Sequence, residues 1–166
     1  MELDHTRGPV RSIVEHVSKR IQMSPGLAGP YKAMIALEGE VVRAAREAGL
    51  EKPLLELVKI RASQLNGCAF CLDMHTRDAI KAGETPRRLF VLNAWRETEL
   101  FTPEERAALE VTEAVTQLST TRDLPDDVYD RATTVFTEQQ YQSLIWAVVA
   151  INAWNRLAVP SHAPLP

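Results

Sequence analysis

The sequence lacks the features that mark membrane, secreted and nucleic-acid-binding proteins. No segment approaches the roughly 20 apolar residues of a membrane-spanning helix, and the longest apolar run covers only residues 144–151. The N-terminus has an early acid, Glu2, and no apolar stretch, so no secretory signal is predicted. The net charge is −3, whereas nucleic-acid binding needs an excess of Lys and Arg. We therefore expect a cytoplasmic protein with no membrane and no nucleic-acid partner.

Cysteine is scarce as well, because Cys68 and Cys71 are the only thiols among 166 residues. In the reducing cytosol, such a close pair is more often catalytic, redox-active or metal-binding than a structural crosslink. The pair is not needed for folding, since a chain of this length buries about 70% of its unfolded surface. With 45% apolar and 25% charged residues, the composition is that of a globular domain.

Apolar residues recur at helical spacing along the chain, without the alternation that is typical of strands. Turn signals such as Ser24-Pro25-Gly26 and Asn66-Gly67 separate the segments. Thr102, Pro103 and Glu105 form a capping-box pattern, and Thr137 is expected to cap the last helix. The pattern predicts an all-α, antiparallel helical bundle with helices over residues 9–21, 31–48, 53–64, 68–82, 86–95, 103–118, 124–135 and 138–157.

The chain is expected to contain one principal domain. We assign residues 1–24 to an N-terminal helical arm, 25–158 to the domain, and 159–166, with three prolines, to a flexible tail. The run over residues 144–151 includes Trp146 and predicts a helix that is apolar all round, buried in the bundle or between subunits. For this reason we expect a homo-oligomer.

The chemistry-bearing residues are concentrated in one predicted helix. Residues three and four apart share a helix face, so Cys68, Cys71 and His75 lie on one side. In a first turn the Cα atoms of the two cysteines are about 5 to 6 Å apart, a distance that permits a disulfide. The helix dipole favours Cys68 as the thiolate. His75, one turn beyond Cys71, instead favours Cys71 as the attacking thiol, because an imidazole there can accept its proton.

Glu56 lies twelve residues before Cys68, on the preceding helix. The Asn66-Gly67 turn can fold that helix back, so that the carboxylate reaches His75. A helical wheel, however, places Glu56 opposite the apolar stripe of its helix, and so favours a solvated pair with Lys59. The residues alone therefore favour a solvated Glu56 over a catalytic one.

The segment from Glu56 to His75 resembles the AhpD-like alkylhydroperoxidase branch of the carboxymuconolactone decarboxylase superfamily. The shared pattern is a Glu, eleven residues, Cys-x-x-Cys, three residues and a His, and every spacing matches. The flanks Ala94-Trp95-Arg96-Glu97 and Ala150-Ile151-Asn152-Ala153-Trp154-Asn155-Arg156 are also similar to this family. The resemblance covers residues 25–158. In one departure, Phe70 stands where better-known members carry a second His.

The resemblance implies an all-helical protein that assembles into trimers or hexamers and reduces peroxides without a metal or flavin cofactor. Carried over by position, Cys71 is the peroxidatic thiol, Cys68 the resolving thiol, and Glu56 and His75 the proton relay. The partners implied are a small-molecule hydroperoxide and an external dithiol reductant, such as a lipoyl-bearing protein.

Four other interpretations are weighed against this thiol peroxidase. The cysteines can be two small buried hydrophobic residues, or two ligands of a zinc site with His75 and either Glu56 or Asp73. A third interpretation is a redox-sensing or binding module of the same fold without turnover, which the absence of a His at position 70 keeps open. The fourth is a decarboxylase-type lyase, although such relatives generally lack the Cys-x-x-Cys motif.

Overall fold

The structure is a computed structural model that describes residues 20–23 and 26–166. The described residues form helices and no strands, which confirms the all-α antiparallel bundle. Residues 9–19 of the first predicted helix, and most of the predicted arm, lie outside the described residues. No helix in the described ranges is both long and apolar enough to cross a membrane. The elements are α2 (Ala28–Glu47), α3 (Lys52–Asn66), α4 (Ala69–Lys81), α5 (Pro86–Val91), the 3-10 helix η1 (Leu92–Glu97), α6 (Pro103–Thr116), α7 (Leu118–Thr121), α8 (Asp126–Val135) and α9 (Glu138–Ser161).

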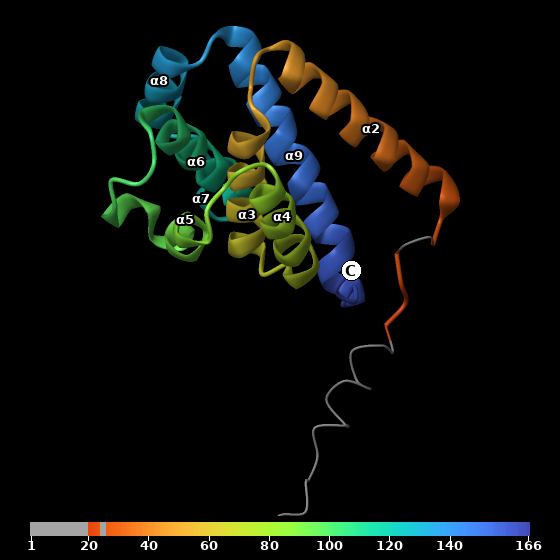
Figure 1. Cartoon of the computed structure of the whole chain (residues 1–166). Coiled ribbons are helices and arrows are strands. Elements are labelled where there is room, and N and C mark those ends of the chain that lie inside the picture. The colour runs from red at the N-terminus through yellow and green to blue at the C-terminus, as the bar shows by residue number, and fades with distance from the viewer. Residues whose placement is uncertain (1–19, 24–25) are drawn as a thin grey trace, which may run out of the picture.

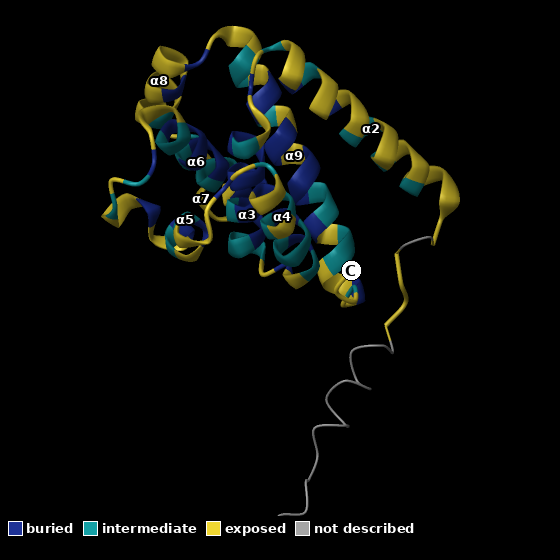
Figure 2. Cartoon of the chain, viewed as in Figure 1, coloured by how far each residue is buried: buried dark blue, intermediate teal, exposed yellow. Residues whose placement is uncertain are grey.

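Helix α3 is the centre of the bundle. It packs against α4, α6 and α9, while α2 lies on α9 and α8 lies on α6 (Figure 1). The N-terminal half of α2 extends away from the body of the bundle and is largely exposed (Figure 2). Because α3 is covered by neighbours on several sides, even its charged residues Glu56 and Lys59 are buried.

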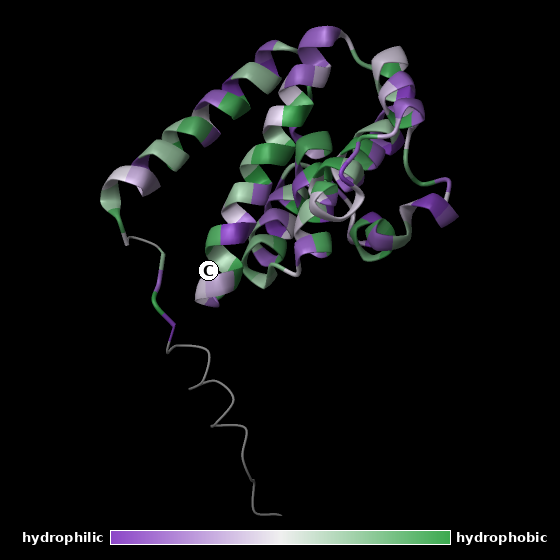
Figure 3. Ribbon diagram, turned by 180° about the vertical axis from the view of Figure 1, so that it is seen from behind, coloured by the Kyte–Doolittle hydropathy of each residue, from purple (hydrophilic) through white to green (hydrophobic). Residues whose placement is uncertain are grey.

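The buried apolar residues form three clusters along the bundle. The largest joins α2, α3, α6, α8 and α9, and a second surrounds the fully buried Trp95. The third consists of Ala62, Cys68, Cys71 and Ile151, where α3, α4 and α9 meet. Hydrophobic residues run along α9 as far as its C-terminal turns (Figure 3). In the single chain, however, Trp146 is 53% exposed, so residues 144–151 are not buried all round within the bundle itself.

The helix ends follow the capping signals in the sequence at two of the clearest positions. Thr102 and Thr137 both form capping boxes. In each, the Thr side chain accepts the backbone N–H of the residue three positions later, and the side chain of that residue accepts the Thr backbone N–H. The segment predicted as one helix over residues 86–95 divides into α5 and η1, with a kink at Ala94.

The last helix is longer than predicted and ends at Ser161 rather than at residue 157. Pro160 removes one N–H donor in the last turn of the helix, and side chains bind the final carbonyl groups, which have no partner within the helix. Arg20 Nη1 donates to the Pro160 carbonyl at 3.0 Å, and Gln22 Nε2 donates to the Ser161 carbonyl at 2.9 Å. The start of the segment assigned to a flexible tail is therefore helical.

Candidate active site

A tight link between α3 and α4 sets the position of the two cysteines. Gly67 follows α3 in the left-handed conformation, with φ 66° and ψ 35°, which glycine adopts without steric cost. The Cys68 N–H then donates to the Ser63 carbonyl at 3.0 Å. Cys68 is the N-cap of α4 rather than a residue of its first turn, and its sulfur accepts the Cys71 N–H at 3.4 Å. The sequence between Asn66 and Cys71 thus places both sulfurs together at the start of α4.

Both thiols are free in the structure and almost fully buried, with 1% of Cys68 and 2% of Cys71 exposed. Cys71 lines a cavity, whereas Cys68 is not among the described residues that form its wall. Access from the cavity therefore distinguishes two cysteines that the sequence places on the same helix face.

Glu56 and His75 form a buried pair, as the folded-back turn predicts. His75 Nδ1 lies 2.8 Å from Glu56 Oε2, and the two residues are 7% and 5% exposed. Because a carboxylate only accepts hydrogen bonds, Nδ1 carries the proton and Nε2 is left as an acceptor. The solvated pair with Lys59 is thus wrong: Lys59 Nζ instead donates to Glu38 Oε1 of α2 at 2.6 Å.

The two thiols have opposite pKa shifts. Hydrogen bonding from the Cys71 side chain lowers the pKa of Cys68 to about 6, and the Cys71 N–H and the Asn155 side chain act in the same direction against burial. The pKa of Cys71 is raised, first because its thiol is the hydrogen-bond partner of Cys68, and then by burial and by the charge of Cys68. Both directions favour Cys68 over Cys71 as the thiolate, in agreement with the helix-dipole argument and not with the argument from His75.

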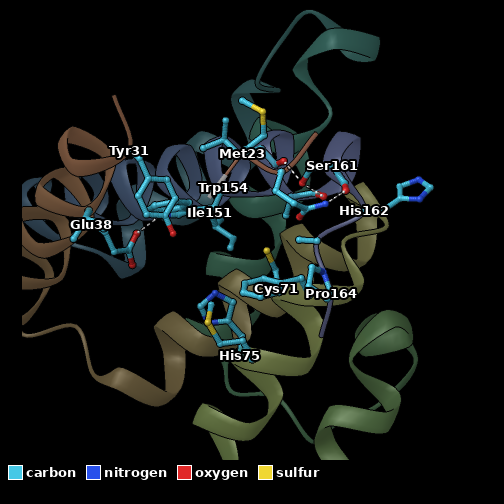
Figure 4. Close-up of a pocket in the computed structure, with 17 residues that line it drawn as sticks. Met23, Tyr31, Glu38, Cys71, His75, Ile151, Trp154, Ser161, His162 and Pro164 are labelled. Atoms are coloured by element: carbon cyan, nitrogen blue, oxygen red, sulfur yellow. Dashed lines mark hydrogen bonds between the residues drawn. The ribbon is translucent and has the colours of Figure 1, made fainter. Parts of the chain in front are cut away.

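The cavity beside Cys71 and His75 has a volume of about 850 Å³. Figure 4 shows the side chains of Cys71 and His75 extending from α4 toward this space. Most of its wall is apolar, and its apolar residues include Tyr31, Ile35, Phe70, Met74, Ile151, Trp154 and Leu157. A cavity of this size and composition suits the apolar part of a drug-sized molecule.

One ion pair and two aromatic rings join α2 to the rest of the cavity wall. Glu38 accepts a hydrogen bond from Trp154 Nε1 at 3.3 Å (Figure 4), in addition to the one from Lys59. Tyr31 packs edge-to-face on Trp154, with ring centroids 5.6 Å apart. Neither Glu38 nor Tyr31 was predicted as a site residue, because their partners lie on helices that are distant along the chain.

The cavity is completed by both ends of the described chain. Gln22 and Met23 line it from one side, and residues 161–164 line it from the other. His162, which the sequence did not single out, is in the left-handed conformation directly after α9. The segment predicted as a flexible tail thus contributes to the wall of the candidate site.

The zinc interpretation requires a cluster of ligand side chains. Among residues 20–23 and 26–166, no group of three or more His, Cys, Asp and Glu side chains has an arrangement that could hold a metal ion. Asp73, one of the two residues considered as a fourth ligand, instead forms an ion pair with Arg77 on the surface of α4.

Comparison with known proteins gives one family and several relatives. Residues 29–114, which contain Glu56, Cys68, Cys71 and His75, match the carboxymuconolactone decarboxylase family. The chain is 45% identical to the uncharacterized protein YdfG of Bacillus subtilis (strain 168) over 114 residues, or 69% of this chain and 77% of YdfG.

The solved structures that are similar to this one include an Agrobacterium protein and a debrominase. A crystal structure of an Agrobacterium tumefaciens protein of unknown function, described as a suspected antioxidant defence protein AhpD, matches with a TM-score of 0.81 and 35% identity. The match covers 89% of this chain and 97% of that protein. A debrominase matches with a TM-score of 0.66 over 80% of this chain and 70% of its own, and at 14% identity shares the fold alone.

Proposed function

The chain belongs to the carboxymuconolactone decarboxylase family, and from this premise we propose that it is an AhpD-like thiol peroxidase. The observation that carries the proposal is the Glu56–His75 hydrogen bond of 2.8 Å beside a cysteine that lines an apolar cavity. A nucleophile, a base and a group that orients the base are the parts that covalent catalysis requires. The apolar wall favours an organic hydroperoxide as the substrate.

In the first proposed step, Cys71 attacks the peroxide. Its thiol proton passes to His75 Nε2 while the sulfur bonds to one peroxide oxygen and the O–O bond breaks. The imidazolium, stabilised by the Glu56 carboxylate, then protonates the departing alkoxide. The products are an alcohol and a sulfenic acid on Cys71, and the relay returns to its starting protonation state.

In the second proposed step, Cys68 resolves the sulfenic acid. Its lowered pKa supports this role, because the thiolate is the form that attacks sulfur. The Cys68–Cys71 bond forms, the S–O bond breaks, and the hydroxide that leaves takes up a proton to give water. An external dithiol then reduces the disulfide by exchange, and is itself oxidised to a disulfide. Since both sulfurs are buried, a slender dithiol such as a lipoyl group suits the cavity. We place the cycle in the cytosol, where dithiols are kept reduced.

We expect the two thiols to form a reversible intramolecular disulfide. Cys68 Sγ already accepts the Cys71 backbone N–H at 3.4 Å, which keeps the two cysteines close, so the step requires little movement. Mass spectrometry after mild treatment with an organic hydroperoxide should show that the protein has lost the mass of about two hydrogen atoms. Dithiothreitol should reverse this loss. Oxidation that stops at sulfinic or sulfonic acid on separate cysteines would contradict the cycle.

The lifetime of the sulfenic acid should depend on pH in a direction set by Cys68. Because the pKa of Cys68 is lowered to about 6, its thiolate is present above this pH and is lost as the pH falls below it. Disulfide formation should therefore slow as the pH falls below the pKa of Cys68, by up to about tenfold for each pH unit. Dimedone trapping in a quenched single turnover should recover more sulfenic acid at pH 5 than at pH 7. Equal recovery would mean that Cys68 does not resolve the intermediate.

We also expect the protein to be a homo-oligomer, a trimer or hexamer by analogy with its family. In the single chain, α2 and α9 expose large apolar side chains, among them Ile35, Val42, Trp146 and Val149. Exposed apolar surface of this kind often marks a subunit contact. Light scattering at micromolar concentration should give a multiple of 18.6 kDa, and the monomer mass would contradict this expectation.

Steady-state peroxide consumption tests the function as a whole. The assay compares an organic hydroperoxide with hydrogen peroxide across a panel of dithiol and monothiol reductants. Turnover with an organic hydroperoxide and a dithiol supports the peroxidase. A disulfide that forms once but supports no turnover with any reductant would instead favour the redox-sensing module.

A further inference from the structure

Two buried polar side chains lie against the cysteines and are not part of the Glu, Cys-x-x-Cys, His motif. Ser63 belongs to α3 and is 0% exposed, and Asn155 belongs to α9 and is 1% exposed. The two cysteines pack in one cluster with Ala62, which precedes Ser63, and with Ile151, one turn before Asn155. Asn155 belongs to the flank that is similar to the family, beyond the matched residues 29–114.

The Asn155 amide is held in one orientation. Asn66 Nδ2 donates to Asn155 Oδ1 at 2.8 Å, so the amide oxygen faces the end of α3 and the NH₂ group faces the other way. Asn155 Nδ2 donates to Ser63 Oγ at 3.1 Å. An amide nitrogen has two hydrogens. Among the residues that the structure describes, no oxygen or nitrogen accepts the second one.

The Ser63 hydroxyl, like the Asn155 amide, has a hydrogen that no described oxygen or nitrogen accepts. Buried hydroxyls in helices commonly donate to the carbonyl one turn earlier, as Thr112 does to Ala108 at 2.7 Å. Ser63 instead accepts from Asn155, and no described oxygen or nitrogen accepts its own hydrogen. Its backbone carbonyl accepts the Cys68 N–H at 3.0 Å, which holds the sulfurs nearby. A buried hydrogen without a partner is costly, which makes the neighbouring cysteine sulfurs the candidate acceptors for both hydrogens.

We propose that Asn155 and Ser63 are positioning residues that direct two hydrogens at the cysteine sulfurs and stabilise the negative charge on the pair. Consistent with this geometry, hydrogen bonding from Asn155 lowers the pKa of both thiols, and that from Ser63 lowers the pKa of Cys71. Donors that stabilise a thiolate favour the dithiol over the disulfide, and so make the disulfide more oxidising. The consequence for turnover rests on the proposed function, whereas the titration of the thiols does not.

The test compares Asn155→Leu and Ser63→Ala with the control Thr116→Val. Leu has the same number of side-chain heavy atoms as Asn, branched at the same carbon, and no donor. Asn66 keeps its second acceptor, Asn152 Oδ1. Thr116→Val removes another buried hydroxyl, which accepts from Asn152 and not from Asn155. Each variant is titrated by thiolate ultraviolet absorbance, and the reduction potential of its disulfide is measured against glutathione.

Asn155→Leu should raise the titration midpoint of the first thiol to ionise by about one pH unit. The reason is that a hydrogen bond to a charged group changes an ionisation equilibrium constant by about a factor of ten or more. The same factor lowers the reduction potential by about 30 mV. Ser63→Ala should shift both values in the same directions, by about threefold in the equilibrium constant, and Thr116→Val should shift neither. If Asn155→Leu does not fold, the midpoint and the reduction potential of Ser63→Ala test the proposal.

Unchanged midpoints in Ser63→Ala and in folded Asn155→Leu would overturn the proposal, even for an active peroxidase. Shifts as large in Thr116→Val would overturn it too, since they would indicate a general loss of packing. Shifted midpoints in a protein without peroxide turnover would uphold this inference while removing the proposed function.

Discussion

Replacement of Cys71 by Ser is expected to abolish peroxide consumption. Cys71 is the sulfur that lines the cavity, and the His75–Glu56 pair adjoins the same space. A serine hydroxyl has nearly the same shape as the thiol but is a far weaker nucleophile at neutral pH, so the S–O bond cannot form. Peroxide consumption with a dithiol reductant should fall to the background rate of the buffer, with the fold unchanged by circular dichroism.

Cys68→Ser is the matched variant and should behave differently. The thiolate that raises the pKa of Cys71 is removed, so the attacking thiol is preserved or becomes easier to ionise. Without a resolving thiol, the enzyme should complete one stoichiometric turnover and keep a sulfenic acid that dimedone traps on Cys71. A sulfenic acid that forms on Cys68 in the Cys71→Ser variant would show that the two roles are reversed.

The sequence was sufficient to predict the bundle because its local signals agree with its fold. Thr102 and Thr137 are each followed by a Glu or Gln three residues later, and both capping boxes form. Gly67 ends α3 in the left-handed conformation that Asn66-Gly67 indicated. Such signals depend on residues within one turn of the chain, so they can be interpreted without knowledge of the tertiary structure.

The polar face of α3 could not be interpreted from a helical wheel. A wheel assumes one wet face and one dry face, but α3 is enclosed by α4, α9 and α6. Glu56 and Lys59, which the wheel assigned to solvent, are buried, and so is Ser63 on the same helix. Each meets a partner on a different helix, in order His75, Glu38 and Asn155. The face that appeared solvated therefore contains the polar residues of the candidate site.

The remaining site residues depend on contacts between segments that are distant in the sequence. Asn155 is 92 residues from Ser63, and Trp154 is 116 residues from Glu38. No local pattern specifies such a pair. Only the spacing shared with the family indicated that Glu56 would reach His75, and it carried no information about Asn155.

Replacement of Glu56 by Gln is expected to lower the second-order rate constant with peroxide by about 10² or more, on the scale of general acid–base groups. Gln is isosteric, and its amide oxygen can still accept the His75 Nδ1 hydrogen, so the ring orientation is preserved. What is lost is the negative charge that stabilises the imidazolium while His75 holds the Cys71 proton. The rate is measured by stopped-flow mixing of the reduced enzyme with an organic hydroperoxide.

Asp73→Asn is the control, because it makes the same change of charge on α4, two residues before His75. Asp73 pairs with Arg77 at the surface and does not contact His75, so this variant should retain the wild-type rate. Thermal unfolding should be nearly the same for both variants, since Gln keeps the hydrogen bond within the buried pair. A full rate in Glu56→Gln, or an equal loss in Asp73→Asn, would exclude Glu56 from the relay. A loss confined to Glu56→Gln would instead mean that the carboxylate acts through its charge on the imidazole that serves Cys71.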